Sequence, residues 1–174
     1  ISGWDCGIFH YSIEESCFKN YLTDRGRPIL QGRIHTIKAF EPNKIYIGSD
    51  QGLTLFDPST QKYITTSYNR NNSSSLSDDF VYDILKDNEG GLWITTYFGG
   101  INYSNPNSSN FTIRHCATES ARGRIISKFH EDKNGDIFIG TDDGGLFIYN
   151  PIKDKCHRYT IDKSNPNLNI HAIW

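Results

Sequence analysis

Methionine is absent from this chain, as are a long apolar run, a C-x-x-C pair and an excess of basic residues. Lysine and arginine number 18 against 20 aspartates and glutamates, a net charge of −2. Nucleic acid is therefore not an expected partner, because phosphate binding needs a basic surface. No stretch of about 18 apolar residues is present to span a bilayer, so membrane contact is expected only through segments outside this one. Because the chain starts at Ile1, we expect it to be part of a longer protein.

The four cysteines have no regular spacing; they are Cys6, Cys17, Cys116 and Cys156. Without a C-x-x-C pair, a zinc centre or a redox centre is not indicated. We interpret the cysteines as packed thiols. Pairing of some of them in an oxidising compartment stays open, because disulfide connectivity does not follow from sequence.

A repeated unit runs through the sequence. Residues 92–101 align position for position with residues 137–146, and Asn-Pro follows each copy. A third copy, one residue shorter in the turn, lies at 45–53, and a weaker one lies at 1–8. The last glycine of each turn recurs every 45 to 48 residues, at Gly7, Gly52, Gly100 and Gly145. A period in this range indicates a repeat architecture.

Each unit contains four short stretches rich in β-branched and aromatic residues, which predicts a four-stranded antiparallel sheet. In the best copy they are residues 80–86, 92–97, 101–104 and 111–115. The second stretch is apolar on both faces, since Leu92 and Ile94 alternate with Trp93. Such a sheet must be packed between neighbours. Four-stranded sheets repeated around an axis are the blades of a β-propeller, and no sustained 3.6-residue period supports helical repeats instead.

The predicted fold class is therefore all-β: a single propeller segment over residues 1–174, with about three complete blades and a partial blade at each end. The expected units are 1–24 as a partial blade, 33–68, 80–116 and 125–161 as blades, and 169–174 as the first strand of the next or closing blade. We favour a fragment of a larger ring of about seven blades. A four-bladed ring closed by the two end pieces is the alternative.

Residues 87–103 and 132–149 resemble the two-component regulator propeller repeat, whose pattern is roughly D-x-x-G-x-L-W-I-G-T-x-x-G-G-L-x-x-Y-x-P. Residues 74–82 also resemble that family, and the likeness covers nearly the whole chain. The sequence departs from it at Thr95 and Cys6, where glycine is usual, and in the hairpin at residues 41–44, which lacks the Asp and the Gly.

This resemblance implies the periplasmic sensor region of a Bacteroidetes hybrid two-component system, a sensor histidine kinase joined to a response regulator. It implies detection of a glycan-derived oligosaccharide and signalling across the membrane to a kinase. The segment itself is not expected to be an enzyme. The alternative is a structural or protein-interaction segment without its own ligand site, whose partners are a second copy or the remaining blades.

Propeller geometry places the turns after the second strands and the links between blades on one rim. Aromatic rings there would stack on a pyranose while Asp, Asn and Arg bind its hydroxyls. The alternative is that the rings only cover the blades beneath them. The predicted ligand-binding residues are Trp4, Asp5, Asp50, Gln51, Tyr97, Phe98, Asp142 and Asp143 from the turns and Arg70, Arg122 and Arg124 from the links. A second set, from first strands lining the central channel, is Tyr82, Asp83, Lys128 and His171.

Neither a catalytic residue, a metal nor a cofactor is expected. Asp132, Asn134 and Asp136 alternate like the start of a calcium loop, but no Glu closes the loop at the twelfth position, so a hairpin turn is predicted. The six histidines are scattered without a metal-ligand pair.

Overall fold

The computed structural model describes residues 2–5, 7–24, 26–107, 111–114, 125–142, 144–161, 163–164 and 168–173. Their regular secondary structure consists of strands, β1 to β16. No helix in this part of the chain is long and apolar enough to cross a membrane.

Three four-stranded antiparallel sheets follow one another along the chain. The first contains β5 (Ile34–Glu41), β6 (Lys44–Ser49), β7 (Gly52–Asp57) and β8 (Lys62–Thr66). The second contains β9 (Val81–Lys86), β10 (Leu92–Thr96), β11 (Gly100–Ser104) and β12 (Phe111–Arg114). The third contains β13 (Ile125–Glu131), β14 (Ile137–Asp142), β15 (Leu146–Asn150) and β16 (Lys155–Tyr159). The hairpin of β1 (Ile8–Ser12) and β2 (Cys17–Tyr21) precedes them, with the short pair β3 (Thr23–Asp24) and β4 (Arg27–Pro28).

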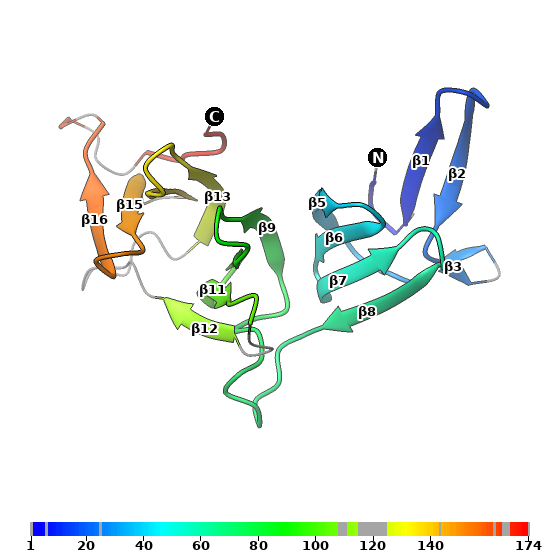
Figure 1. Ribbon diagram of the computed structural model, residues 1–174, viewed down its shortest axis with the longest axis horizontal. Helices are drawn as coiled ribbons and strands as arrows, with labels where there is room; N and C mark the ends of the chain where they lie inside the picture. The colour runs from blue at the N-terminus through cyan, green and yellow to red at the C-terminus, as the bar shows by residue number, and fades with distance from the viewer. Residues whose placement is uncertain are drawn as a thin grey trace.

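Each large sheet is a meander in which strands that are neighbours in sequence are neighbours in space. The three sheets stand side by side in an arc, with their first strands β5, β9 and β13 on the inner, concave side (Figure 1). This arrangement is that of consecutive propeller blades, which confirms the predicted fold class.

The hydrophobic cores lie between sheets, as the two-faced apolar strands predict. Ile47 of β6 packs with residues of the N-terminal segment, whereas the adjacent Tyr46 packs toward the second sheet. In β10, Ile94 shares the core of Tyr46, and Trp93 faces the next core, which β13, β14 and β15 complete. Successive side chains of one strand thus belong to different cores, because they point to opposite faces of the sheet.

In the second and third sheets, an aspartate closes the hairpin between the first and second strands. Asp87 Oδ1 accepts hydrogen bonds from the backbone N–H groups of Glu89 (3.1 Å) and Gly91 (2.6 Å). Asp132 Oδ1 accepts the equivalent bonds from Asn134 (2.8 Å) and Asp136 (2.9 Å). Residues 132–136 therefore form the predicted hairpin turn. Within the described residues, no group of three or more His, Cys, Asp or Glu side chains is arranged to hold a metal ion.

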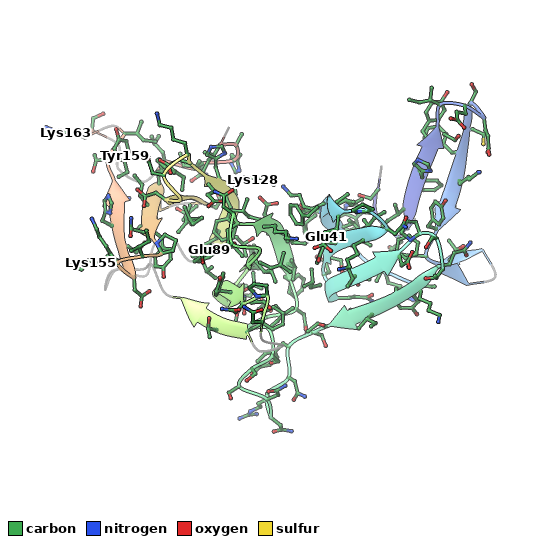
Figure 2. The ribbon with its side chains drawn as sticks, viewed as in Figure 1. Glu41, Glu89, Lys128, Lys155, Tyr159 and Lys163 are labelled. Carbon is green, nitrogen blue, oxygen red and sulfur yellow. The ribbon has the colours of Figure 1, made fainter. Side chains whose placement is uncertain are left out.

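Ion pairs join the first and second sheets. Lys86 Nζ of β9 lies 2.5 Å from Glu41 Oε1 of β5, and Lys44 of β6 contacts the other oxygen of the same carboxylate (Figure 2). One carboxylate at the end of β5 thus bridges two strands of its own sheet and one of the next.

The cysteines differ from the packed thiols expected from sequence. Cys17 is free, whereas Cys156 in β16 is disulfide-bonded. Cys6 and Cys116 lie outside the described residues. The sequence left this alternative open, since spacing alone does not reveal which chain segments the fold brings together.

Candidate functional site

Residues from the N-terminal segment and from two blades converge on one cavity of about 240 Å³. We call it the rim cavity; its lining residues are Trp4, Arg33, His35, Asp50, Phe80, Tyr82, Tyr97 and Phe98. It lies where turns follow second strands, because Asp50 comes directly after β6 and Tyr97 directly after β10. Four predicted ligand-binding residues, Trp4, Asp50, Tyr97 and Phe98, meet here.

Asp50 organises the polar side of the rim cavity. Its Oδ2 accepts the backbone N–H of Arg33 at 2.9 Å, and its Oδ1 lies 2.7 Å from His35 Nε2. The Arg33 guanidinium lies over the Trp4 ring, 4.6 Å from its centroid, in cation–π geometry. A carboxylate, an imidazole, a guanidinium and an indole are therefore held together at the edge of the first sheet.

Aromatic rings form the opposite side. Tyr82 stacks on His35 with ring centroids 4.1 Å apart, and Tyr97 lies 5.4 Å from Tyr82. Phe98 meets Tyr97 edge-on at 4.4 Å, and its backbone N–H is held by Asp78 Oδ2 at 2.9 Å. The turn is therefore ordered although the Phe98 side chain is 72% exposed.

Burial raises the pKa of the Tyr82 hydroxyl, and the negative charges of Asp50 and Asp142 act in the same direction. Asp142, another predicted residue, is thus close enough to influence the cavity electrostatically. Its Oδ1 is buried and, among the residues that the structure describes, has no hydrogen-bond partner. The hydroxyl of Tyr82 remains protonated at neutral pH and can donate a hydrogen bond.

The other predicted ligand-binding residues that the structure describes are not among the residues that line the cavity. Asp5 Oδ1 accepts the backbone N–H of Gly32, and Gln51 Oε1 accepts that of Gln31, so both side chains hold the neighbouring backbone. Arg70 is exposed in the link between β8 and β9. Asp143, Arg122 and Arg124 lie outside the described residues.

Sequence reasoning missed three lining residues, Arg33, His35 and Phe80. A signal for His35 exists, because His35 and Tyr82 occupy the second position of their first strands, β5 and β9. Aligning the repeats at their first strands, as well as at their turns, would have found the stacked pair.

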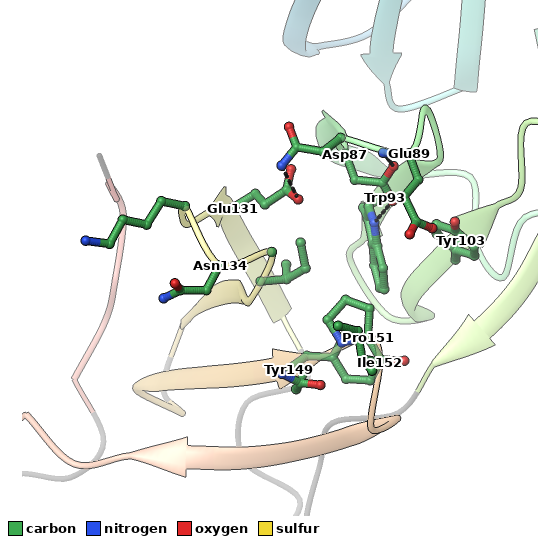
Figure 3. Close-up of a pocket in the computed structure, with 14 residues that line it drawn as sticks. Asp87, Glu89, Trp93, Tyr103, Glu131, Asn134, Tyr149, Pro151 and Ile152 are labelled. Carbon is green, nitrogen blue, oxygen red and sulfur yellow. Dashed lines mark hydrogen bonds between the residues drawn. The ribbon is translucent and has the colours of Figure 1, made fainter.

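A larger cavity, of about 380 Å³, lies between the second and third sheets (Figure 3). The turns between first and second strands line it, so it lies on the rim opposite the rim cavity. Its floor is formed by the core residues Trp93, Ile137 and Tyr149, which are at most 5% exposed. Asp87, on its wall, already accepts a hydrogen bond from Trp93 Nε1 at 2.8 Å and closes its own hairpin. These four residues therefore serve the packing of the two blades and the closure of a hairpin, and the rim cavity is the better candidate site.

Comparison with known proteins identifies the repeat. Residues 75–98 match the family model described as two component regulator propeller. The matched stretch covers β9 and β10 and ends at Tyr97 and Phe98, so it includes part of the rim cavity. The resemblance expected from sequence is confirmed there.

Solved structures share the fold of this chain at low sequence identity. The extracellular domain of the hybrid two component system BT3049 from B. thetaiotaomicron is similar with a TM-score of 0.70 and 20% identity, over 88% of this chain and 20% of that one. The extracellular domain of BT4673 from the same organism gives 0.69 and 19%, over 89% and 22%. PorZ, a surface component of the type-IX secretion system of Porphyromonas gingivalis, gives 0.68 and 14%, over 92% and 25%.

The chain therefore spans about a fifth to a quarter of the length of these solved chains. A comparison with curated protein sequences finds no match.

Proposed function

We propose that this segment belongs to the extracytoplasmic sensor region of a hybrid two-component signalling protein and that its rim cavity binds a saccharide. The segment acts in binding and not in catalysis, and the signal passes to a kinase elsewhere in the protein. The observation that carries the proposal is the convergence of Trp4, Asp50, Tyr97 and Phe98 on one cavity.

The chemistry of the rim cavity suits a sugar. Trp4 is 67% exposed and Phe98 72% exposed, so the Phe98 ring and the Trp4 face that Arg33 does not cover are available to the apolar side of a pyranose ring. Asp50 and Arg33 supply charged hydrogen-bonding groups beside these rings. A site with aromatic walls and a few fixed polar groups is the usual form of a small-molecule site.

The extracytoplasmic location rests on two independent supports. The propeller repeat and the likeness to extracellular domains of hybrid two-component systems favour it. The disulfide of Cys156 favours it as well, because disulfides persist in oxidising compartments such as the periplasm.

A thermal-shift screen of the chain against neutral and acidic oligosaccharides tests the proposal. A saccharide present at about 100 times its Kd raises the free energy of unfolding by about 2.7 kcal/mol, because it binds only the native state. We expect Trp4→Ala and Phe98→Ala to weaken a bound saccharide about tenfold or more, through loss of stacking. Both side chains are mostly exposed, so unliganded stability should change little.

Tyr159→Ala is the matched control, since Tyr159 is an exposed aromatic on the outer strand β16 (Figure 2). It should leave saccharide binding unchanged. Stabilisation that survives both rim variants, or no stabilisation by any saccharide, would contradict the proposal and favour the structural or protein-interaction alternative.

A further inference from the structure

A buried carboxylate lies between the first strands of all three blades. Asp83 of β9 is 2% exposed. Its Oδ1 accepts a hydrogen bond from Thr36 Oγ1 of β5 at 3.1 Å, and its Oδ2 accepts one from the backbone N–H of Phe129 of β13 at 3.4 Å. Asp83 thus makes contacts to both neighbouring blades and is closed to a ligand.

Two lysines flank this carboxylate, and we call them the lysine pair. Lys38 Nζ of β5 lies 3.2 Å from Asp83 Oδ1, and Lys128 Nζ of β13 lies 3.8 Å from Asp83 Oδ2. Their side chains are 37% and 38% exposed. Within the described part of the chain neither lysine has a second carboxylate partner. The two lysines and Asp83 together therefore carry a net charge of one positive unit.

The lysine pair faces the inner side of the arc. Figure 2 shows Lys128 on the concave side, where Figure 1 places β5, β9 and β13. Asp83 directly follows Tyr82 of the rim cavity, and Lys38 follows His35 by three residues, which is about 10 Å along a strand. A ligand seated in the rim cavity would therefore have to extend over about this distance to reach the pair.

We propose that Lys38 and Lys128 form an oxyanion site on the inner side of the blades, which takes the carboxylate or sulfate group of an acidic saccharide. Two ammonium groups already held by Asp83 need little reordering to receive an anion, which lowers the entropic cost of binding. Their hydrogen bonds to an oxyanion are charge-assisted and therefore stronger than neutral ones. An anion there supplies the negative charge that the cluster lacks and connects the first and third blades.

The identity of the ligand as a saccharide rests on the proposed function, whereas the oxyanion site does not. Calorimetric titration of the whole chain with three probes separates the two. The probes are sodium sulfate, trigalacturonate and the methyl ester of trigalacturonate, which keeps the sugar backbone and removes the charge.

We expect trigalacturonate to bind about tenfold more tightly than its ester, and salt to weaken that difference. Lys38→Gln and Lys128→Gln should each weaken trigalacturonate and sulfate about tenfold or more and leave the ester unchanged. Lys38→Arg should retain anion binding because it keeps the charge. Lys155→Gln, at an exposed lysine of β16, is the matched control and should change nothing.

Thermal melting establishes that each variant is folded before titration. Equal binding of the acid and the ester, unaffected by the lysine substitutions, would overturn the oxyanion site and leave saccharide binding at the rim standing. Sulfate binding that requires both lysines, without saccharide binding, would support the oxyanion site with a free anion as its ligand and count against the proposed function. If the folded protein binds neither sulfate nor trigalacturonate, the oxyanion site is overturned.

Discussion

Glycine at positions 48 and 140 allows one blade to approach the next. A Cβ atom at position 48 would lie 2.7 Å from Val81 Cγ1 and 2.9 Å from the Val81 carbonyl oxygen, both in the first strand of the following sheet. A Cβ atom at position 140 would meet Ile170 at 2.7 Å in the same way. These glycines serve close packing, because no side chain fits between each glycine and the segment that packs against it.

Gly48→Ala should therefore destabilise the chain by about 1–3 kcal/mol, the usual cost of overpacking a core. The measurement is the free energy of unfolding in urea, and far-UV circular dichroism should show that the variant keeps its strands. An unchanged urea midpoint would mean that the first two blades can move apart without loss of stability. The close contacts with Val81 would then not limit the residue at position 48.

Thr95 occupies the corresponding place in the second blade, where the repeat usually has glycine. It is fully buried, and its hydroxyl accepts the backbone N–H of Asp83 at 2.8 Å. The register of β9 against β10 shifts between Thr95 and Thr96, so a ladder hydrogen bond is replaced by one to a side chain. Thr95, which replaces the glycine usual in the repeat, thus holds the backbone of Asp83, whose carboxylate contacts the lysine pair.

At the scale of the strand, Glu41 makes the junction of the first two blades sensitive to acid. Hydrogen bonds from Lys44 and from Lys86 lower the pKa of Glu41 from 4.5 to about 2. A carboxyl with a lowered folded-state pKa stabilises the fold fully above its ordinary pKa, and this stabilisation is lost as pH falls from about 4.5 to about 2.

We therefore expect the Tm of the native chain to fall more steeply between pH 4.5 and pH 2 than that of Glu41→Gln, and the two curves to converge toward pH 2. Asp57, whose pKa is also about 2 because Ser59 and Thr60 donate hydrogen bonds to it, keeps part of the acid sensitivity in both proteins. Glu14→Gln, at an exposed glutamate of the β1–β2 turn, is the control. Parallel curves for Glu41→Gln and the native chain would refute the role of this ion pair.

The strands of the best repeat were predictable because their signal is local. The predicted stretches 80–86, 92–97, 101–104 and 111–115 agree with β9 to β12 to within one residue at each end that the structure describes. The apolar faces of Trp93 and Ile94 likewise predict the cores between sheets, since alternation alone decides which face a residue occupies.

Contacts between blades were not predictable, because they depend on how adjacent sheets are rotated and spaced. Asp83 and Lys128 were singled out as residues lining a channel, yet the sequence does not show that Asp83 is buried and that Lys38 joins them. The meeting of Trp4 with Arg33 likewise requires the N-terminal segment to lie beside the first sheet, and no repeat period encodes that.

At the scale of the whole molecule, the disulfide of Cys156 ties the outermost strand of the third blade to another part of the chain. Removing a native disulfide from a secreted domain costs about 2–5 kcal/mol, so Cys156→Ser or dithiothreitol should lower the Tm by several degrees. Cys17→Ser is the matched control, because Cys17 is free. A Tm that does not respond to dithiothreitol, together with two additional reactive thiols under native conditions, would show that the bond does not form.

The placement of every core between consecutive sheets also bears on how such chains change in length. The second sheet presents one apolar face to the sheet before it and another to the sheet after it, and the first sheet lies in the same way between the N-terminal segment and the second sheet. Duplication or deletion of one entire unit of 45 to 48 residues preserves the pairing of apolar faces, whereas loss of half a unit leaves a face without its counterpart. Genes encoding this architecture should therefore gain and lose whole repeats, with their breakpoints at equivalent positions of the repeat.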